Sequence, residues 1–86
     1  MYWVYILDNY IKSDFISVTI DMGERIKEHR EEMVNANMDP DQLKVKYQEY
    51  HANAVEALFR EKELKAMTPF RLNKYLNNLL RDQGFF

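Results

Sequence analysis

Glu61 is the residue of this chain whose surroundings most clearly suggest chemistry. A helix over this segment places Glu61 on one stripe with Ala57, Leu58 and Leu64. A carboxylate among apolar neighbours is costly unless it is paired or bound to a cation. One carboxylate, completed by water and a substrate phosphate, suits a single Mg²⁺ or Mn²⁺ ion. The alternative is a carboxylate at the edge of the stripe that pairs with Arg25 or a lysine.

Arg25 and His29 lie four residues apart, so on a helix they project from one side. An arginine grips a phosphate through two parallel hydrogen bonds, and a histidine beside it can orient a water. The alternative for Arg25 is a solvated helix face beside Glu24 and Glu28. The alternative for His29 is packing against the core.

The strands that would position these residues follow from the pattern of apolar residues. Residues 2–7 are apolar without alternation, which predicts a central strand buried on both faces. Residues 8–14 read as a hairpin loop, and the β-branched residues of 15–20 predict a second strand. Apolar and polar residues alternate over 43–48, which predicts a half-exposed third strand at an edge of the sheet.

Helix starts are marked by residues that satisfy free backbone N–H groups. Asp21 is a predicted N-cap, with Glu24 three residues on as its capping-box partner. Asn53 is placed to cap a second helix, and Thr68-Pro69 to begin a third that Gly84 ends. The predicted fold class is α+β, a small three-stranded antiparallel sheet flanked by three helices in the order β-β-α-β-α-α.

Composition limits the classes of function. The chain has 86 residues, which predicts a single domain over residues 1–86. It has no cysteine, so a disulfide or a thiolate metal site is excluded. No apolar run approaches the ~20 residues that cross a bilayer, so we expect a cytoplasmic protein without a membrane role. The net charge of −2 leaves DNA binding to a local patch, such as Lys62, Lys65, Arg71 and Lys74.

Four short segments occur in an order that resembles the GIY-YIG nuclease family, in particular its small stand-alone members. Trp3-Val4-Tyr5 stands where the family has Gly-Ile-Tyr, and Phe15-Ile16-Ser17 where it has Tyr-Ile-Gly. Arg25 follows at the family's spacing, and Arg60-Glu61-Lys62-Glu63-Leu64-Lys65 completes the pattern. The resemblance covers nearly the whole chain, and it implies a nuclease-like fold.

The resemblance also implies roles for individual residues. Tyr5, Arg25 and His29 match catalytic positions of the family, and Glu61 matches the glutamate that holds its single catalytic metal. We therefore expect these four side chains to converge on one concave face.

Two positions depart from the family pattern, and both weaken the expectation of cleavage. The family's second-motif tyrosine is taken to activate the attacking water, and Phe15 has no hydroxyl with which to move a proton. Loss of a general base typically costs ~10²–10⁴-fold in rate. Ser17 replaces a glycine, so its side chain narrows the site.

Three functions remain open. The first is a degenerate nuclease-fold domain that acts as a binding or regulatory module, with weak DNA binding or a protein partner. The second is an active Mg²⁺-dependent DNA endonuclease whose base is replaced by Tyr5, a metal-bound water or Tyr10. The third is a protein-interaction module, including a homodimer, without a nucleic-acid role.

Overall fold

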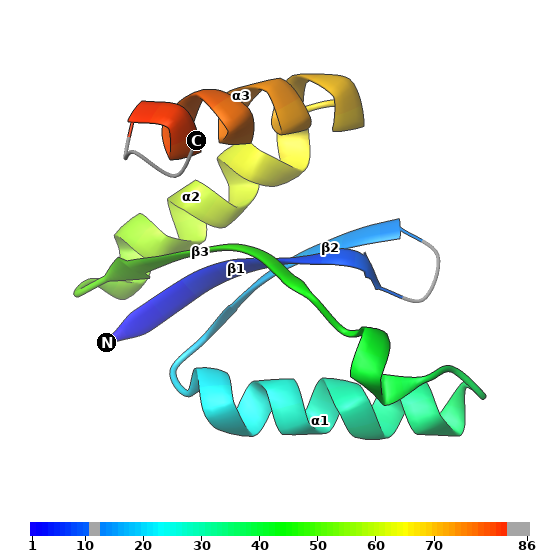
Figure 1. Ribbon diagram of the computed structural model, residues 1–86. Coiled ribbons are helices and arrows are strands. Elements are labelled where there is room, and N and C mark those ends of the chain that lie inside the picture. Colours follow the sequence, from blue (N-terminus) through cyan, green and yellow to red (C-terminus); the bar gives the residue numbers. More distant parts are fainter. Residues whose placement is uncertain (11–12, 83–86) are drawn as a thin grey trace.

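The structure, a computed structural model, describes residues 1–10 and 13–82 (Figure 1). Its core is a three-stranded antiparallel sheet with α1 on one face and α2 and α3 on the other. The strands are β1 (Tyr2–Tyr10), β2 (Ser13–Thr19) and β3 (Val45–His51); the helices are α1 (Met22–Asn35), the short 3₁₀ helix η1 (Pro40–Gln42), α2 (Ala54–Ala66) and α3 (Pro69–Asp82). The predicted α+β class and order of strands and α-helices are confirmed.

The central strand divides the core into two layers. The strand order is β2-β1-β3, so β1 is central, and Val4, Tyr5, Ile6 and Leu7 are all fully buried. Alternate residues of a strand point to opposite faces. Val4 and Ile6 pack in the cluster formed with α2 and α3, whereas Tyr5 and Leu7 pack in the cluster formed with α1.

The two strands of the β1–β2 hairpin are longer, and the loop between them is shorter, than predicted. The sequence indicated a loop over residues 8–14, but β1 continues to Tyr10 and β2 begins at Ser13. The ladder survives an irregularity between Leu7 and Tyr10, and Tyr10 pairs with Ser13. Polar residues therefore stay in strand because the backbone pairing extends beyond the apolar run. Residues 11–12 lie outside the described part.

The third strand begins at Val45, two residues later than predicted, because η1 occupies residues 40–42 and Leu43 caps it. The strand lies at an edge, as predicted. A register shift opposite Ile6 and Leu7 changes the alternation expected for 43–48. Leu43 packs in the α1 layer, whereas Tyr47 packs in the α2–α3 layer.

The predicted N-caps form. The Asp21 carboxylate accepts from the backbone N–H of Glu24 at 3.1 Å, and Asn53 Oδ1 accepts from Val55 N at 2.7 Å. The predicted capping box between Asp21 and Glu24 does not form. The backbone N–H of Asp21, which a capping box gives to Glu24, donates to Thr19 Oγ1 at 3.2 Å instead.

The two C-terminal helices cover the second face of the sheet. Ala57 and Leu64 of α2 and Leu72 and Leu76 of α3 are buried against it. Leu58 was predicted on the buried stripe of α2, but its side chain is exposed because it follows Ala57 by about 100° around the helix. Gly84, predicted to end α3, lies outside the described residues. Within residues 1–10 and 13–82, no helix combines the length and apolar composition needed to span a membrane.

Candidate functional site

Three of the four predicted site residues meet between β1 and α1. The Tyr5 hydroxyl lies 2.7 Å from His29 Nε2, and Arg25 Nε donates to the same hydroxyl at 3.2 Å. Tyr5 comes from the central strand, and Arg25 and His29 come from successive turns of α1. The cluster forms because the stripe of α1 that carries His29 faces the sheet, as its spacing predicted.

The cluster lies inside the core. Tyr5 and His29 are both 0 % exposed. The Phe15 ring packs edge-on against the imidazole of His29, with ring centroids 5.1 Å apart, and lies 6.3 Å from the Tyr5 ring. Ser17 pairs with Tyr5 across the sheet. The two residues of the altered motif therefore border the cluster.

Burial keeps the His29 imidazole neutral. Desolvation lowers the pKa of His29, the positive charge of Arg25 lowers it further, and the Glu32 carboxylate, 3.6 Å from Nδ1, partly opposes both. A neutral imidazole that carries its proton on Nδ1 accepts a hydrogen bond from the Tyr5 hydroxyl at Nε2, while the Tyr5 oxygen accepts a hydrogen bond from Arg25 Nε. This arrangement satisfies Tyr5 inside the core.

Arg25 is the most accessible member of the cluster, with a side chain 31 % exposed. Its guanidinium already has an anionic partner, because Nη1 lies 2.7 Å from Glu28 Oε2. The hydrogen bonds to Glu28 and then to Tyr5 raise the pKa of Arg25. A phosphate that approached Arg25 would compete with Glu28.

Glu61 does not join the cluster, so the predicted convergence of four residues is wrong. Glu61 lies on α2, which covers the face of the sheet opposite α1 (Figure 1). Its side chain is 21 % exposed, and its carboxylate lies 3.4 Å from Lys65 Nζ. This is the alternative that the sequence had left open, a carboxylate that pairs with a lysine. The stripe that holds Glu61 was identified, but the side of the sheet that the helix covers was not.

The metal site predicted at Glu61 stays a prediction. In the described part of the chain, no three histidine or acidic side chains gather where they could hold a metal ion. A site built from one carboxylate, water and a substrate phosphate needs no such group. The surroundings of such a site differ from the expectation, because a cation at Glu61 would lie on the face of the sheet opposite Arg25 and His29.

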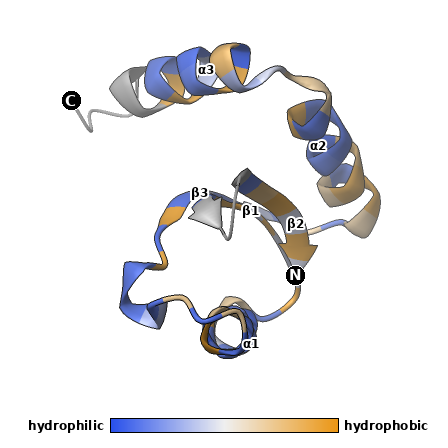
Figure 2. Cartoon of the chain, turned by 90° about the vertical axis from the view of Figure 1, so that its right-hand side faces the viewer, coloured by the Kyte–Doolittle hydropathy of each residue, from blue (hydrophilic) through white to orange (hydrophobic). Residues whose placement is uncertain are grey.

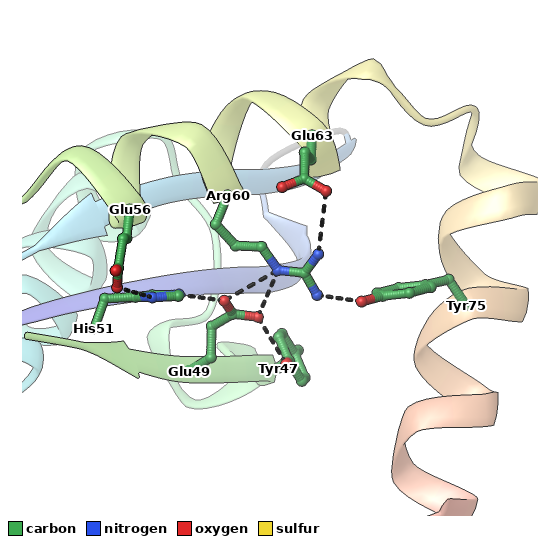
Figure 3. A network of polar contacts seen from close by, with 7 residues as sticks. All are labelled: Tyr47, Glu49, His51, Glu56, Arg60, Glu63 and Tyr75. Atoms are coloured by element: carbon green, nitrogen blue, oxygen red, sulfur yellow. Dashed lines mark hydrogen bonds and ion pairs between the residues drawn. The ribbon is translucent and has the colours of Figure 1, made fainter. Parts of the chain in front are cut away.

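A second polar cluster, which the sequence interpretation missed, joins β3, α2 and α3 (Figure 3). Arg60 Nε contacts both carboxylate oxygens of Glu49 at 3.0 Å, and Arg60 Nη2 donates to the Tyr75 hydroxyl. The Tyr47 hydroxyl donates to Glu49 at 2.8 Å, and His51 Nε2 contacts the other Glu49 oxygen. Tyr47, Glu49 and His51 alternate along β3, and this spacing was the signal available in the sequence.

The contacts of this cluster favour an ionised Glu49 and a protonated, neutral Tyr47. Burial alone would raise the pKa of Glu49, but hydrogen bonds from His51, Tyr47 and Arg60 outweigh burial and lower it. Burial and the hydrogen bond to Glu49 raise the pKa of Tyr47 to about 12. Through Arg60, the cluster connects α2 to Glu49 of β3 and to Tyr75 of α3.

A cavity of about 650 Å³ opens between the β1–β2 hairpin and the start of α3. Lys46 crosses it, with Nζ 2.9 Å from Asp14 Oδ2 and in contact with Asn73. Among the six predicted site residues, only Phe15 lines this cavity. The cavity therefore adjoins the Tyr5 cluster only at Phe15.

Comparisons with protein-family models, curated proteins and solved structures find no match to this chain. The resemblance to GIY-YIG nucleases therefore rests on the quoted motifs.

Proposed function

We propose that this chain is a nuclease-like domain of GIY-YIG type that does not cleave nucleic acid and works as a binding module. The observation that carries the proposal is the complete burial of Tyr5 and His29 beneath Phe15 and α1. A general base must come within hydrogen-bond reach of the proton that it removes, directly or through one water. Tyr5 and His29 have no exposed surface, so a bound phosphodiester does not come within hydrogen-bond distance of either side chain.

The alternative of an active endonuclease has less support. Tyr5, the first replacement base, is buried and already bonded to His29 and Arg25. Glu61, the expected metal ligand, lies on the opposite face of the sheet. Positioned groups and a positioned metal accelerate phosphodiester cleavage only when they meet at one phosphate.

A protein is the better-supported ligand of such a module. Ten acidic and six basic residues precede Ala54, so Arg25 lies in the acidic part of the chain. Val55, Leu58 and Phe59 expose apolar surface on α2. Contiguous exposed apolar surface marks interaction sites.

DNA binding is the second candidate. From Ala54 onward the chain has six basic and four acidic residues, and Lys62, Lys65, Arg71 and Lys74 are all exposed. Few phosphate contacts are available, so binding would be weak and steeply salt-dependent, with each neutralised phosphate adding ~0.9 to the slope of log affinity against log salt.

The cleavage assay tests the proposal. We expect the wild-type chain to show no turnover above a protein-free control on single-stranded, duplex or branched DNA with Mg²⁺ or Mn²⁺. We expect Glu61→Ala to behave identically, because Glu61 has no role in a reaction that does not occur. Metal-dependent turnover by the wild type that Glu61→Ala abolishes would contradict the proposal.

A further inference from the structure

The cavity between the β1–β2 hairpin and the start of α3 has the volume of a small-molecule site. It measures about 650 Å³, within the ~300–1,000 Å³ typical of ligand pockets, which are mostly apolar with a few polar groups. The hairpin end of the sheet and the start of α3 lie on one side of the molecule in Figure 1. Figure 2 looks onto that side, with the layer of α2 and α3 above the sheet and α1 below it.

The apolar wall of this cavity belongs to the core between the sheet and the two C-terminal helices. Leu64 and Leu72 are 0 % and 4 % exposed, and both belong to the buried cluster on this face of the sheet. Phe15, Ile16 and Met67 also line the cavity. An aromatic side chain and a thioether both make favourable contacts with an aromatic ring. The wall therefore suits an apolar ligand that carries a ring.

Four charged side chains line the cavity, and three of them have a partner of opposite charge. Lys46 Nζ lies 2.9 Å from Asp14 Oδ2, and Lys65 Nζ lies 3.4 Å from Glu61 Oε2. Asp8 is the fourth, and no cation within residues 1–10 and 13–82 forms an ion pair with its carboxylate. The cavity therefore carries one negative charge that no neighbouring cation offsets.

The backbone of β1 directs this carboxylate toward the cavity. Alternate residues of a strand face the same side, so Asp8 follows Val4 and Ile6 on the side of α2 and α3. The backbone N–H of Asp8 donates to the carbonyl oxygen of Lys44 at 2.9 Å, which holds this part of β1 beside the neighbouring strand. A half-buried carboxylate beside an apolar wall gains from a cation that pairs with it.

We propose that this cavity binds a small organic cation, a primary ammonium group on an apolar body such as an arylalkylamine. The ammonium group donates charge-assisted hydrogen bonds to the carboxylate of Asp8. The apolar body packs against Phe15, Met67 and Leu72. This site goes beyond the proposed binding of a protein or DNA, because it takes a small molecule and does not depend on Arg25, His29 or Glu61.

The ion pairs of the cavity predict selectivity against anions. A carboxylate ligand that approached Lys46 would compete with Asp14, and one that approached Lys65 would compete with Glu61. It would also be repelled by Asp8. An ammonium ligand meets the one carboxylate of the lining that has no cationic partner among the described residues, so it gains a contact without breaking one.

A titration with phenethylammonium, followed by amide NMR shifts, tests the site. We expect saturable binding with a dissociation constant of about 1 mM, with shifts at Ile16, Leu64 and Leu72 and none at Val34 of α1. 2-Phenylethanol has a similar body without the charge and should bind about tenfold more weakly, and 3-phenylpropionate should not bind. Absence of saturable shifts up to about 20 mM phenethylammonium, or equal binding of 2-phenylethanol, overturns the proposal.

A matched pair of variants tests the role of Asp8. Asp8→Asn should weaken phenethylammonium binding at least about tenfold and leave 2-phenylethanol binding unchanged, which also shows that the cavity is still folded. Asp41→Asn is the control, because it removes the same charge from η1, which does not line this cavity, and it should bind phenethylammonium as the wild type does. Equal losses in the two variants, undiminished phenethylammonium binding by Asp8→Asn, or loss of 2-phenylethanol as well in Asp8→Asn overturns the assignment.

Discussion

Replacing Arg60 by methionine should lower the free energy of unfolding by about 2–3 kcal/mol in a denaturant titration. Arg60 and Glu49 are 17 % and 16 % exposed, so the substitution leaves a largely buried carboxylate without its guanidinium. It also removes the donor to Tyr75, which connects α3 to α2. Methionine keeps an unbranched apolar stem, so the loss reports on the charged contacts more than on packing.

Arg71→Met is the matched control for this prediction. Arg71 lies on the exposed side of α3, where substitutions typically change stability by less than about 0.5 kcal/mol. A double-mutant cycle with Glu49→Gln should give a coupling free energy of more than about 1 kcal/mol, because the two side chains are in direct contact. Equal losses in Arg60→Met and Arg71→Met would show that the cluster does not hold the helices on the sheet.

Stability should fall as the pH is lowered from 8 to 5.5, with His29 as the responsible group. Burial lowers the pKa of His29 in the folded chain below its ordinary value of about 6.5. The unfolded chain therefore takes up a proton at pH values where the folded chain does not, which favours unfolding. The contribution of His29 is complete above about pH 6.5 and is lost progressively below it. For a domain of this size, each 1 kcal/mol lost lowers the thermal midpoint by about 4–8 °C.

One variant tests this assignment. His29→Gln keeps a polar side chain that can reach the Tyr5 hydroxyl but does not titrate, so the thermal midpoint of the variant should change much less between pH 8 and 5.5. The assignment to His29 is wrong if the wild-type slope persists in His29→Gln.

The fold was largely predictable because its signals are local. The unbroken apolar run of β1 indicates burial on both faces, and Asp21 and Asn53 begin helices by accepting backbone N–H groups a few residues away. The strand ends were less predictable. The Tyr10–Ser13 pair and the register shift near Leu7 depend on backbone hydrogen bonds, which side-chain pattern does not encode.

The candidate site was predicted only in part for a similar reason. The period of α1 identified the stripe that carries His29, and β1 supplied Tyr5, so their contact followed once α1 packed on that face. The period of α2 identified the stripe of Glu61, but a helical stripe does not state which face of a sheet it covers. That choice depends on how β3 leads into α2, and it separates Glu61 from Arg25.

A cleavage assay of the Phe15→Tyr, Ser17→Gly double variant tests most directly whether Glu61 is separated from the Tyr5 cluster. The two substitutions restore the residue types of the second motif, so any remaining defect lies in the positions of the other groups. Our account predicts no metal-dependent turnover with Mg²⁺ or Mn²⁺, because Glu61 stays on the opposite face from Tyr5, Arg25 and His29. Turnover that appears in the double variant and disappears when Glu61→Ala is added would show that these groups meet at one phosphate, and it would contradict the account.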